Sequence, residues 1–281
     1  MRKIEVNEIT EEIARLAQES NYYLPDEMEE ALEKAASQEE SPAAREALEQ
    51  IRKNAEIAAE EKLPMCQDTG VTIVFAEIGN QVELVGGTLK EAVNAGVRKG
   101  YKEGYLRKSI VTDPAGSRKN TGDNTPAIIH TELVSGDELK LTVAPKGGGS
   151  ENMSRLEMLT PAAGLEGVKD FVVDTVIEAG PNPCPPIIVG VGIGGNFEKC
   201  ALLAKKALLE PLAPEKKDSE MPELERELLE EINQSGIGAQ GFGGITTALA
   251  VNIKTHPCHI ASLPVAVNIN CHAARHKSTV I

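Results

Sequence analysis

The sequence predicts a mixed α+β fold, in which a helical N-terminal region is followed by a mixed sheet flanked by helices. Two observations indicate this class. Residues 7–62 place apolar side chains at helical spacing among charged ones, whereas from Val71 onward short β-type runs alternate with helical runs. The chain has 281 residues, enough to bury a large core. We therefore expect a single domain, 1–281, with a helical part at 1–62 and a mixed α/β part at 63–281.

The N-terminal part is predicted to form three helices. Ile9, Ile13 and Leu16 lie three or four residues apart, so they share one face of the first helix. Asp26 follows a proline and is the expected N-cap of the second helix. The third helix is rich in Ala, Glu and Lys and is expected from Ala43 to Glu60.

The remaining part alternates strands with helices. Val71–Ile78 is rich in β-branched residues and ends at a Gly-Asn pair, which is typical of a strand. Thr88 and Glu91 have capping-box spacing and begin a helix that runs to about Lys102. Turn residues at Ser135–Asp137 predict a hairpin. The hairpin strands are 127–133 and 138–143, and further strands are expected at 187–193, 245–253 and 263–269. Helices are expected at 161–179, 196–209 and 218–234, and Asp218 or Ser219 is the expected cap of the last one. Residues 212–218 are the expected exposed loop.

Charge and composition exclude several classes of partner. The formal net charge of −14 argues against nucleic acid, although a small site can still be locally positive and take an anionic substrate. No apolar run is long enough to cross a bilayer, and Met1–Val6 lacks the apolar core of a signal peptide. We therefore expect a cytoplasmic protein that binds neither nucleic acid nor membrane.

Three of the five cysteines lie in turn-rich segments, where a fixed backbone can aim a side chain at a ligand. Cys66, Cys184 and Cys271 are surrounded by Pro, Gly, Asn and Asp, and three thiolates from distant segments favour a metal or iron–sulfur centre with one open position. The absence of C-x-x-C excludes a zinc ribbon. The alternative is that the cysteines are small buried apolar residues. Cys200, in an apolar helical pattern, fits that alternative, and Cys258 lies in a His-Pro-Cys-His segment that could bind a metal alone.

Polar residues near these cysteines offer chemistry, each with a structural alternative. Gln67 and Asp68 follow Cys66. Asp68 is a candidate general acid or base, and the structural alternative is that its side chain only forms an ordinary Asx turn. The glycines of Pro145–Ser150 bring backbone N–H groups close to an anion or form a flexible loop. Arg107 and His259 are candidates for binding a carboxylate; otherwise they are solvated or structural. Gly190–Gly195 matches G-x-G-x-x-G, but its context indicates a tight strand–helix turn and not a dinucleotide site.

Six segments together resemble the class I, iron–sulfur-dependent fumarate hydratases. The similarity is to the alpha subunit of the two-subunit form, which is itself similar to the alpha subunit of L-tartrate dehydratase, and it extends from about residue 7 to the end. Six motifs in the same order are more specific than any one of them. The segments are Met65–Gly70, Asn120–Pro126, Lys146–Ser150, Pro183–Pro186, Gly238–Gly244 and Asn270–His272.

The resemblance implies a set of site residues. Cys66, Cys184 and Cys271 would hold a [4Fe–4S] cluster that leaves one iron without a protein ligand. Asp68 would contact the dicarboxylate substrate and is the candidate for proton transfer. The family's Cys-Ser at the third ligand is Cys-His here, which is a departure. The other implied substrate contacts are Gln67, Arg107, one of Gly148 and Gly149, and His259.

The resemblance also implies an activity and a partner. The chain would be the catalytic domain of a hydro-lyase subunit that hydrates fumarate reversibly to L-malate, a reaction of the tricarboxylic acid cycle. A separate beta subunit would complete the active site within a larger hetero-oligomer. The alternatives are an L-tartrate dehydratase alpha subunit, which converts tartrate to oxaloacetate, a non-catalytic iron–sulfur module, and a nucleotide-binding protein that uses one of the glycine-rich loops.

Overall fold

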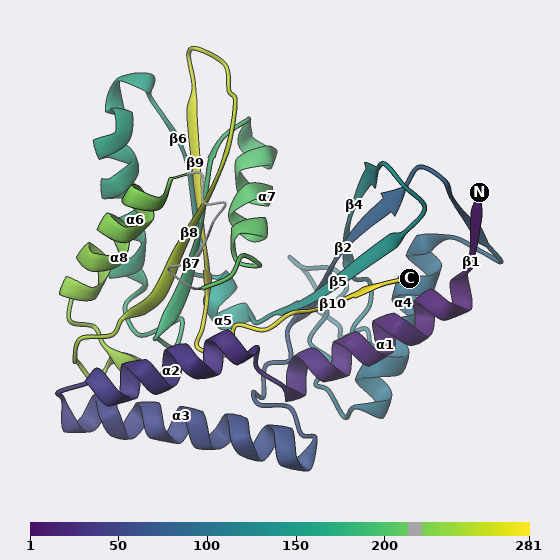
Figure 1. The fold of residues 1–281 in the computed structure, drawn as a ribbon, viewed down its shortest axis with the longest axis horizontal. Helices are drawn as coiled ribbons and strands as arrows, with labels where there is room; N and C mark the ends of the chain where they lie inside the picture. The colour runs from purple at the N-terminus through teal and green to yellow at the C-terminus, as the bar shows by residue number, and fades with distance from the viewer. Residues whose placement is uncertain (213–220) are drawn as a thin grey trace. The chain divides into compact units, whose positions relative to one another are not determined.

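The computed structural model describes residues 1–212 and 221–281 (Figure 1). The chain forms two compact units, each assembled from segments that are distant in the sequence. Unit 1 comprises residues 1–25, 54–148 and 275–281, and unit 2 comprises residues 26–53 and 149–274. Both units combine helices with a sheet, so the predicted α+β class is confirmed. The expectation of a single domain stays a prediction.

Unit 1 is a sheet with two helices packed on it. Its elements are β1 (Arg2–Glu5), α1 (Val6–Tyr22), β2 (Val71–Gly79), β3 (Val82–Val85), α4 (Leu89–Glu103), β4 (Ile128–Val134), β5 (Leu139–Lys146) and β10 (Lys277–Val280). The four-stranded sheet has the order β10-β5-β2-β4, and β1 pairs with β3. Helices α1 and α4 approach closely because α4 has glycine at the crossing: a Cβ on Gly96 would lie 2.6 Å from the carbonyl oxygen of Thr10. Their apolar faces and the inner face of the sheet form the core of this unit.

The predicted hairpin of 127–133 and 138–143 is wrong. Strands β4 and β5 form close to the expected residues, but β2 lies between them, parallel to β4 and antiparallel to β5. The reason is burial, because β2 is apolar on both faces and buried over residues 72–76, whereas β4 is largely exposed. A strand that is apolar on both faces takes the centre of a sheet, and the more polar strand takes the edge.

Unit 2 is a second sheet covered on both faces. Its elements are α2 (Asp26–Gln38), the first part of α3 (Pro42–Glu61), most of α5 (Gly148–Glu151), β6 (Arg155–Leu159), the 3₁₀ turn η1 (Pro161–Ala163), α6 (Gly164–Ala179), β7 (Ile187–Gly194), α7 (Phe197–Ala207), α8 (Pro222–Gln234), the turn η2 (Ala239–Gly241), β8 (Ala248–His256) and β9 (Leu263–Asn270). The strand order is β6-β9-β7-β8. Helix α7 covers one face, and α6 and α8 cover the other (Figure 1), where the main core of the unit lies.

The glycines of Gly190–Gly195, at the end of β7, allow a helix to pack closely on the strand. A Cβ on Gly190 would lie 2.3 Å from the carbonyl oxygen of Ala204, and one on Gly192 would lie 2.1 Å from that of Cys200. Helix α7 can therefore lie directly on β7 only because these positions lack side chains. Gly194 and Gly195 have positive φ and make the predicted tight turn into α7.

Most expected elements are present, and local chemistry explains their ends. Thr88 and Glu91 form the predicted capping box of α4, and Asn196 caps α7 by accepting the N–H of Lys199 at 3.0 Å. Asp26 lies in the first turn of α2, where a carboxylate complements the helix dipole. The expected loop at 212–218 and the expected caps Asp218 and Ser219 lie outside the described residues, apart from Leu212. Four short strands, β1, β3, β6 and β10, were not expected. Among the residues that the structure describes, no helix has the length and apolarity to span a membrane.

Candidate active site

The segment Cys66–Gly70 is an ordered loop of unit 1 between α3 and β2. Its start is anchored on both sides of Met65, whose N–H donates to the carbonyl oxygen of Asn21 at 2.9 Å and whose carbonyl oxygen accepts from Asn54 Nδ2 at 2.7 Å. Cys66 is partly exposed, and its Sγ accepts the N–H of Asp68 at 3.4 Å. The same Sγ lies 3.6 Å from Gln67 Oε1, so the side chain is held between its two neighbours in the loop.

Three successive carbonyl oxygens of this loop are held by buried side chains. Arg275 Nη2 donates to the oxygen of Asp68 at 2.7 Å. The hydroxyl of Tyr101 lies 2.7 Å from the oxygen of Thr69 and 3.1 Å from that of Gly70, and Asn124 Nδ2 donates to the latter at 3.1 Å. Burial raises the pKa of Tyr101 to about 12, so its hydroxyl remains a donor at neutral pH. The loop backbone is therefore fixed from three directions.

The Asp68 carboxylate is partly exposed and held by two backbone N–H groups. Oδ1 accepts from Gly70 at 3.1 Å, which is the Asx turn considered from the sequence, and Oδ2 accepts from Gly148 at 2.7 Å. A Cβ on Gly147 would lie 3.3 Å from Oδ2, so glycine at that position leaves room for the carboxylate. The turn fixes this carboxylate two residues from the Cys66 thiol.

Arg107 lies beside the same loop. Its carbonyl oxygen accepts a hydrogen bond from the hydroxyl of Thr69 at 2.9 Å, and the residue as a whole is exposed. Unit 1 thus brings Cys66, Gln67, Asp68 and Arg107 together with Gly148. Arg107 is therefore tied through its backbone to the loop that carries the Cys66 thiol and the Asp68 carboxylate.

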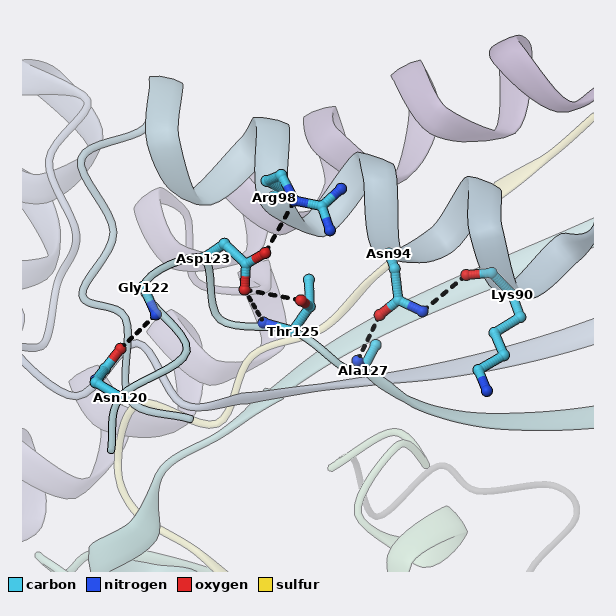
Figure 2. A network of polar contacts seen from close by, with 8 residues as sticks. All are labelled: Lys90, Asn94, Arg98, Asn120, Gly122, Asp123, Thr125 and Ala127. Atoms are coloured by element: carbon cyan, nitrogen blue, oxygen red, sulfur yellow. Dashed lines mark hydrogen bonds and ion pairs between the residues drawn. The ribbon is translucent and has the colours of Figure 1, made fainter. Parts of the chain in front are cut away.

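The motif Asn120–Pro126 forms a turn in which Asp123 contacts Thr125 and Arg98 of α4 (Figure 2). Asp123 accepts from Thr125 N and Oγ1, at 3.0 and 2.7 Å, and from Arg98 Nε at 2.9 Å. Burial alone would raise the pKa of Asp123, but the Thr125 bonds and the Arg98 charge outweigh it and lower the pKa to about 2. The turn holds Asn124, which is fully buried and accepts the N–H of Ser109 at 2.7 Å, in reach of Gly70.

Cys184 and Cys271 lie next to each other in unit 2. The start of β7 pairs with the end of β9, with Ile188 opposite Asn270. The N–H of His272 donates to the carbonyl oxygen of Cys184 at 3.3 Å, so the two cysteine segments are tied directly. Cys184 is exposed and has φ of +57°, which is uncommon for a residue other than glycine, and its Sγ lies 3.9 Å from the carbonyl oxygen of Asn182 in the same loop.

His259 lies at the other end of the same sheet, on the connection between β8 and β9, which extends beyond the strands in Figure 1. Gly194 pairs with His256 at that end, whereas Ile188 pairs with Asn270 at the cysteine end. At about 3.3 Å per residue, β7 separates the two ends by about 20 Å. Unit 2 therefore does not bring His259 to Cys184 and Cys271.

The residues of the His-Pro-Cys-His segment use their polar atoms locally. The His256 ring contacts the carbonyl oxygen of Pro257, and Cys258 Sγ donates to that of Ser262. The N–H of Ala261 donates to His259 Nδ1 at 3.1 Å, so the proton of the neutral imidazole lies on Nε2. Across residues 1–212 and 221–281, no group of three or more His, Cys, Asp or Glu side chains is arranged to hold a metal ion.

The cysteines nevertheless provide a suitable donor set for an iron–sulfur cluster. All five lie in described segments and none forms a disulfide. Cys200 is fully buried in α7, and burial raises the pKa of its thiol, so it packs as an apolar residue. Cys66, Cys184 and Cys271 are exposed or partly exposed, as ligands to an added group must be. Cys66 belongs to unit 1 and the other two to unit 2, so their use as a common ligand set stays a prediction.

Sequence reasoning missed the residues that hold the loops. Tyr101, Asn124 and Arg275 act through backbone carbonyls, and only Asn124 lies in a segment that the sequence singled out. Gln240, from the glycine-rich segment 238–244, donates through both its N–H and its side chain to the carbonyl oxygen of Pro185, at 2.8 and 2.7 Å. The one available signal was an arginine, Arg275, four residues after the third cysteine.

Residues 10–280 match the family described as fumarate hydratase (Fumerase). This chain belongs to the fumarate hydratase (Fumerase) family. A protein of Methanocaldococcus jannaschii named putative L(+)-tartrate dehydratase subunit alpha is 44% identical over 273 residues, which cover 95% of both chains. The L(+)-tartrate dehydratase subunit alpha of Escherichia coli K12 is 30% identical over 278 residues, covering 98% of this chain and 91% of that protein.

Membership of the Fumerase family confirms the resemblance that the six segments indicated. The family description and the relatives' names agree on enzymes that add or remove water, so they support a hydro-lyase subunit. Each of the relatives named above is called an alpha subunit, which for those proteins implies a second subunit.

Proposed function

We propose that this chain is the alpha subunit of an iron–sulfur-dependent hydro-lyase that hydrates fumarate reversibly to L-malate. The observation that carries the proposal is the loop Cys66–Gly70, which holds a thiol and a carboxylate two residues apart on a backbone anchored by Tyr101, Asn124 and Arg275. Adding water across a double bond beside a carboxylate requires a proton donor or acceptor at a fixed position, and Asp68 provides one.

Cys66, Cys184 and Cys271 would hold a [4Fe–4S] cluster, because their thiols are of the donor type that such clusters use. When bound, the cluster would supply a Lewis acid through an iron that lacks a protein ligand. The tie between His272 and Cys184 keeps two of the three ligand segments adjacent without the cluster. Removal of the cluster should therefore leave the protein folded.

The remaining chemistry belongs to side chains of this chain. Asp68, held by the N–H groups of Gly70 and Gly148, would move the proton at the substrate carbon. The Arg107 guanidinium would pair with one substrate carboxylate, for which its planar fork is suited. Gln67 and the N–H of Gly149 would complete the polar contacts, since the N–H of Gly148 already serves Asp68. A beta subunit would supply further groups for the dicarboxylate.

A second substrate, L-tartrate, is favoured by the names of the relatives. Tartrate carries one more hydroxyl than malate, so the two substrates differ in the polar groups that the site must satisfy. The test is an assay of the anaerobically reconstituted complex of this chain with its beta subunit on both substrates. We expect interconversion of fumarate and malate, and no activity of the isolated chain. Turnover of tartrate alone would replace fumarate by tartrate as the substrate.

His259 would bind the second substrate carboxylate from another copy of the chain. Within one copy it lies at the far end of the sheet from Cys184 and Cys271, about 20 Å along β7. Its Nε2–H faces away from the local bond at Nδ1, and the adjacent Ile260 is 93% exposed. An exposed apolar tip that carries a polar donor is suited to contact with another chain.

Mixing two inactive variants tests this arrangement. Random assembly of symmetric dimers from Asp68→Asn and His259→Ala chains makes about half of the dimers mixed. One of the two sites in each mixed dimer has both native residues, so about a quarter of wild-type activity should return. Mixing Asp68→Asn with Asp68→Ala is the control and should restore none. If both residues serve the same site from a single copy, the first mixture will also stay inactive.

A further inference from the structure

Glu39 is a fully buried carboxylate just beyond the end of α2, more than a hundred residues before Cys184 in the sequence. Its Oε1 accepts the N–H groups of Glu40 and Ser41, both at 3.0 Å, and its Oε2 accepts the N–H of Ile245 at 3.0 Å. A buried carboxylate is tolerated when several N–H groups point at it. The third of these bonds joins the helical N-terminal part of unit 2 to the glycine-rich segment.

The segment Gly238–Ile245, here called the glycine loop, is closed tightly by this carboxylate. Gly238 pairs with Gly243, and a Cβ on Gly238 would lie 1.6 Å from the carbonyl oxygen of Gly243. A Cβ on Gly244 would lie 2.5 Å from Glu39 Oε1. Only glycine permits either approach. Glu39 therefore anchors one end of the glycine loop.

The middle of the glycine loop holds the loop of Cys184. Gln240 has φ of +52°, which lets both its N–H and its Nε2 donate to the carbonyl oxygen of Pro185, at 2.8 and 2.7 Å. Pro185 follows Cys184 directly. A Cβ on Gly241 would lie 2.5 Å from Pro181 Cβ, so the two loops are in contact on both sides of Cys184.

We propose that Glu39 and Gln240 are positioning residues for Cys184. Glu39 fixes the glycine loop, and Gln240 transmits that order to the peptide that follows the cysteine. The thiol would then be presented in one conformation before any cluster arrives, which is what a supporting shell around a metal ligand achieves. The inference rests on the proposed function in one respect, since it treats Cys184 as a cluster ligand.

Hydrogen exchange of the full-length chain, without cluster and under reducing conditions, tests the coupling. Residues 181–187 contain four prolines, so only Asn182, Cys184 and Ile187 have exchanging amides, and that of Cys184 is bonded to the carbonyl oxygen of Pro181 at 3.0 Å. In Glu39→Gln and in Gln240→Met we expect this amide to exchange about tenfold faster, the effect of losing one hydrogen bond. Both variants should also retain less iron after anaerobic reconstitution.

Glu225→Gln is the matched control. Glu225 is another buried carboxylate of unit 2, and it accepts the N–H of Ile253 at 2.8 Å, on a strand outside both loops. Its replacement should leave exchange at Cys184 unchanged. Gln240→Met keeps the backbone bond to Pro185 and serves as the informative variant if Glu39→Gln does not fold.

The outcomes separate this inference from the proposed function. Faster exchange within the glycine loop but unchanged exchange at Cys184 would overturn the coupling. If exchange in the variants is faster both in the glycine loop and at Cys184, but the wild-type protein takes up no iron, the coupling is supported and the cluster assignment is overturned. Faster exchange at both, together with reduced iron retention, would support the two proposals.

Discussion

Cys184→Ser is expected to lose iron binding while keeping its fold. A serine hydroxyl is a hard donor that stays protonated at neutral pH, whereas iron–sulfur clusters require thiolates. Loss of a residue that only hydrogen-bonds to a metal ligand costs about 10- to 100-fold in metal affinity. Loss of the ligand itself, the Cys184 thiolate, should therefore cost at least about a hundredfold. Cys184 is exposed, so the substitution should change the free energy of unfolding by less than about 0.5 kcal/mol.

The measurement is an anaerobic count of iron and sulfide together with the EPR spectrum. Cys258→Ser provides the control, because Cys258 is also exposed and its only described bond is to the carbonyl oxygen of Ser262. The control should retain wild-type iron. Thermal unfolding of both variants without cluster checks that the fold is unaffected. Wild-type iron content in Cys184→Ser would remove this cysteine from the ligand set, and Cys66→Ser and Cys271→Ser extend the same test to the other two.

Asp68→Asn is expected to lower kcat by about 10²- to 10⁴-fold, the usual cost of losing a positioned acid or base. KM and iron content should change much less, because the substitution keeps the size of the side chain and leaves Cys66 in place. The amide can still accept one of the two N–H groups that the carboxylate accepts from Gly70 and Gly148. Its NH₂ group then faces the other, so a stability loss of about 1 kcal/mol is expected as well.

Asp113→Asn is the control for the structural part of this effect. Asp113 also accepts a backbone N–H in a turn of unit 1, from Ser117 at 2.7 Å, and hydrogen bonds lower the pKa of its carboxyl. Its replacement should affect the turn and leave kcat near wild type. Steady-state kinetics of the reconstituted complex measure both variants. A kcat for Asp68→Asn within a few-fold of wild type would assign the proton transfer to another residue.

Local chemistry allowed much of this protein to be predicted from its sequence. The capping box at Thr88 and Glu91 predicted the start of a helix, because the bonds involved span only three residues. The Asx turn at Asp68 was likewise visible, since Asp and Gly two residues apart form it without help from elsewhere. The order of six motifs was sufficient to indicate the family.

The rest depended on partners that are distant in the sequence. The neighbours of β2, the carbonyl anchors Tyr101 and Arg275, and the bond from Glu39 to Ile245 join segments separated by tens to hundreds of residues. Burial decides these pairings, because each buried polar group must find a partner once the cores form. The sequence by itself determined the family and predicted which residues would carry the chemistry. Only the tertiary structure decided which backbone groups hold them and at which end of the sheet each one lies.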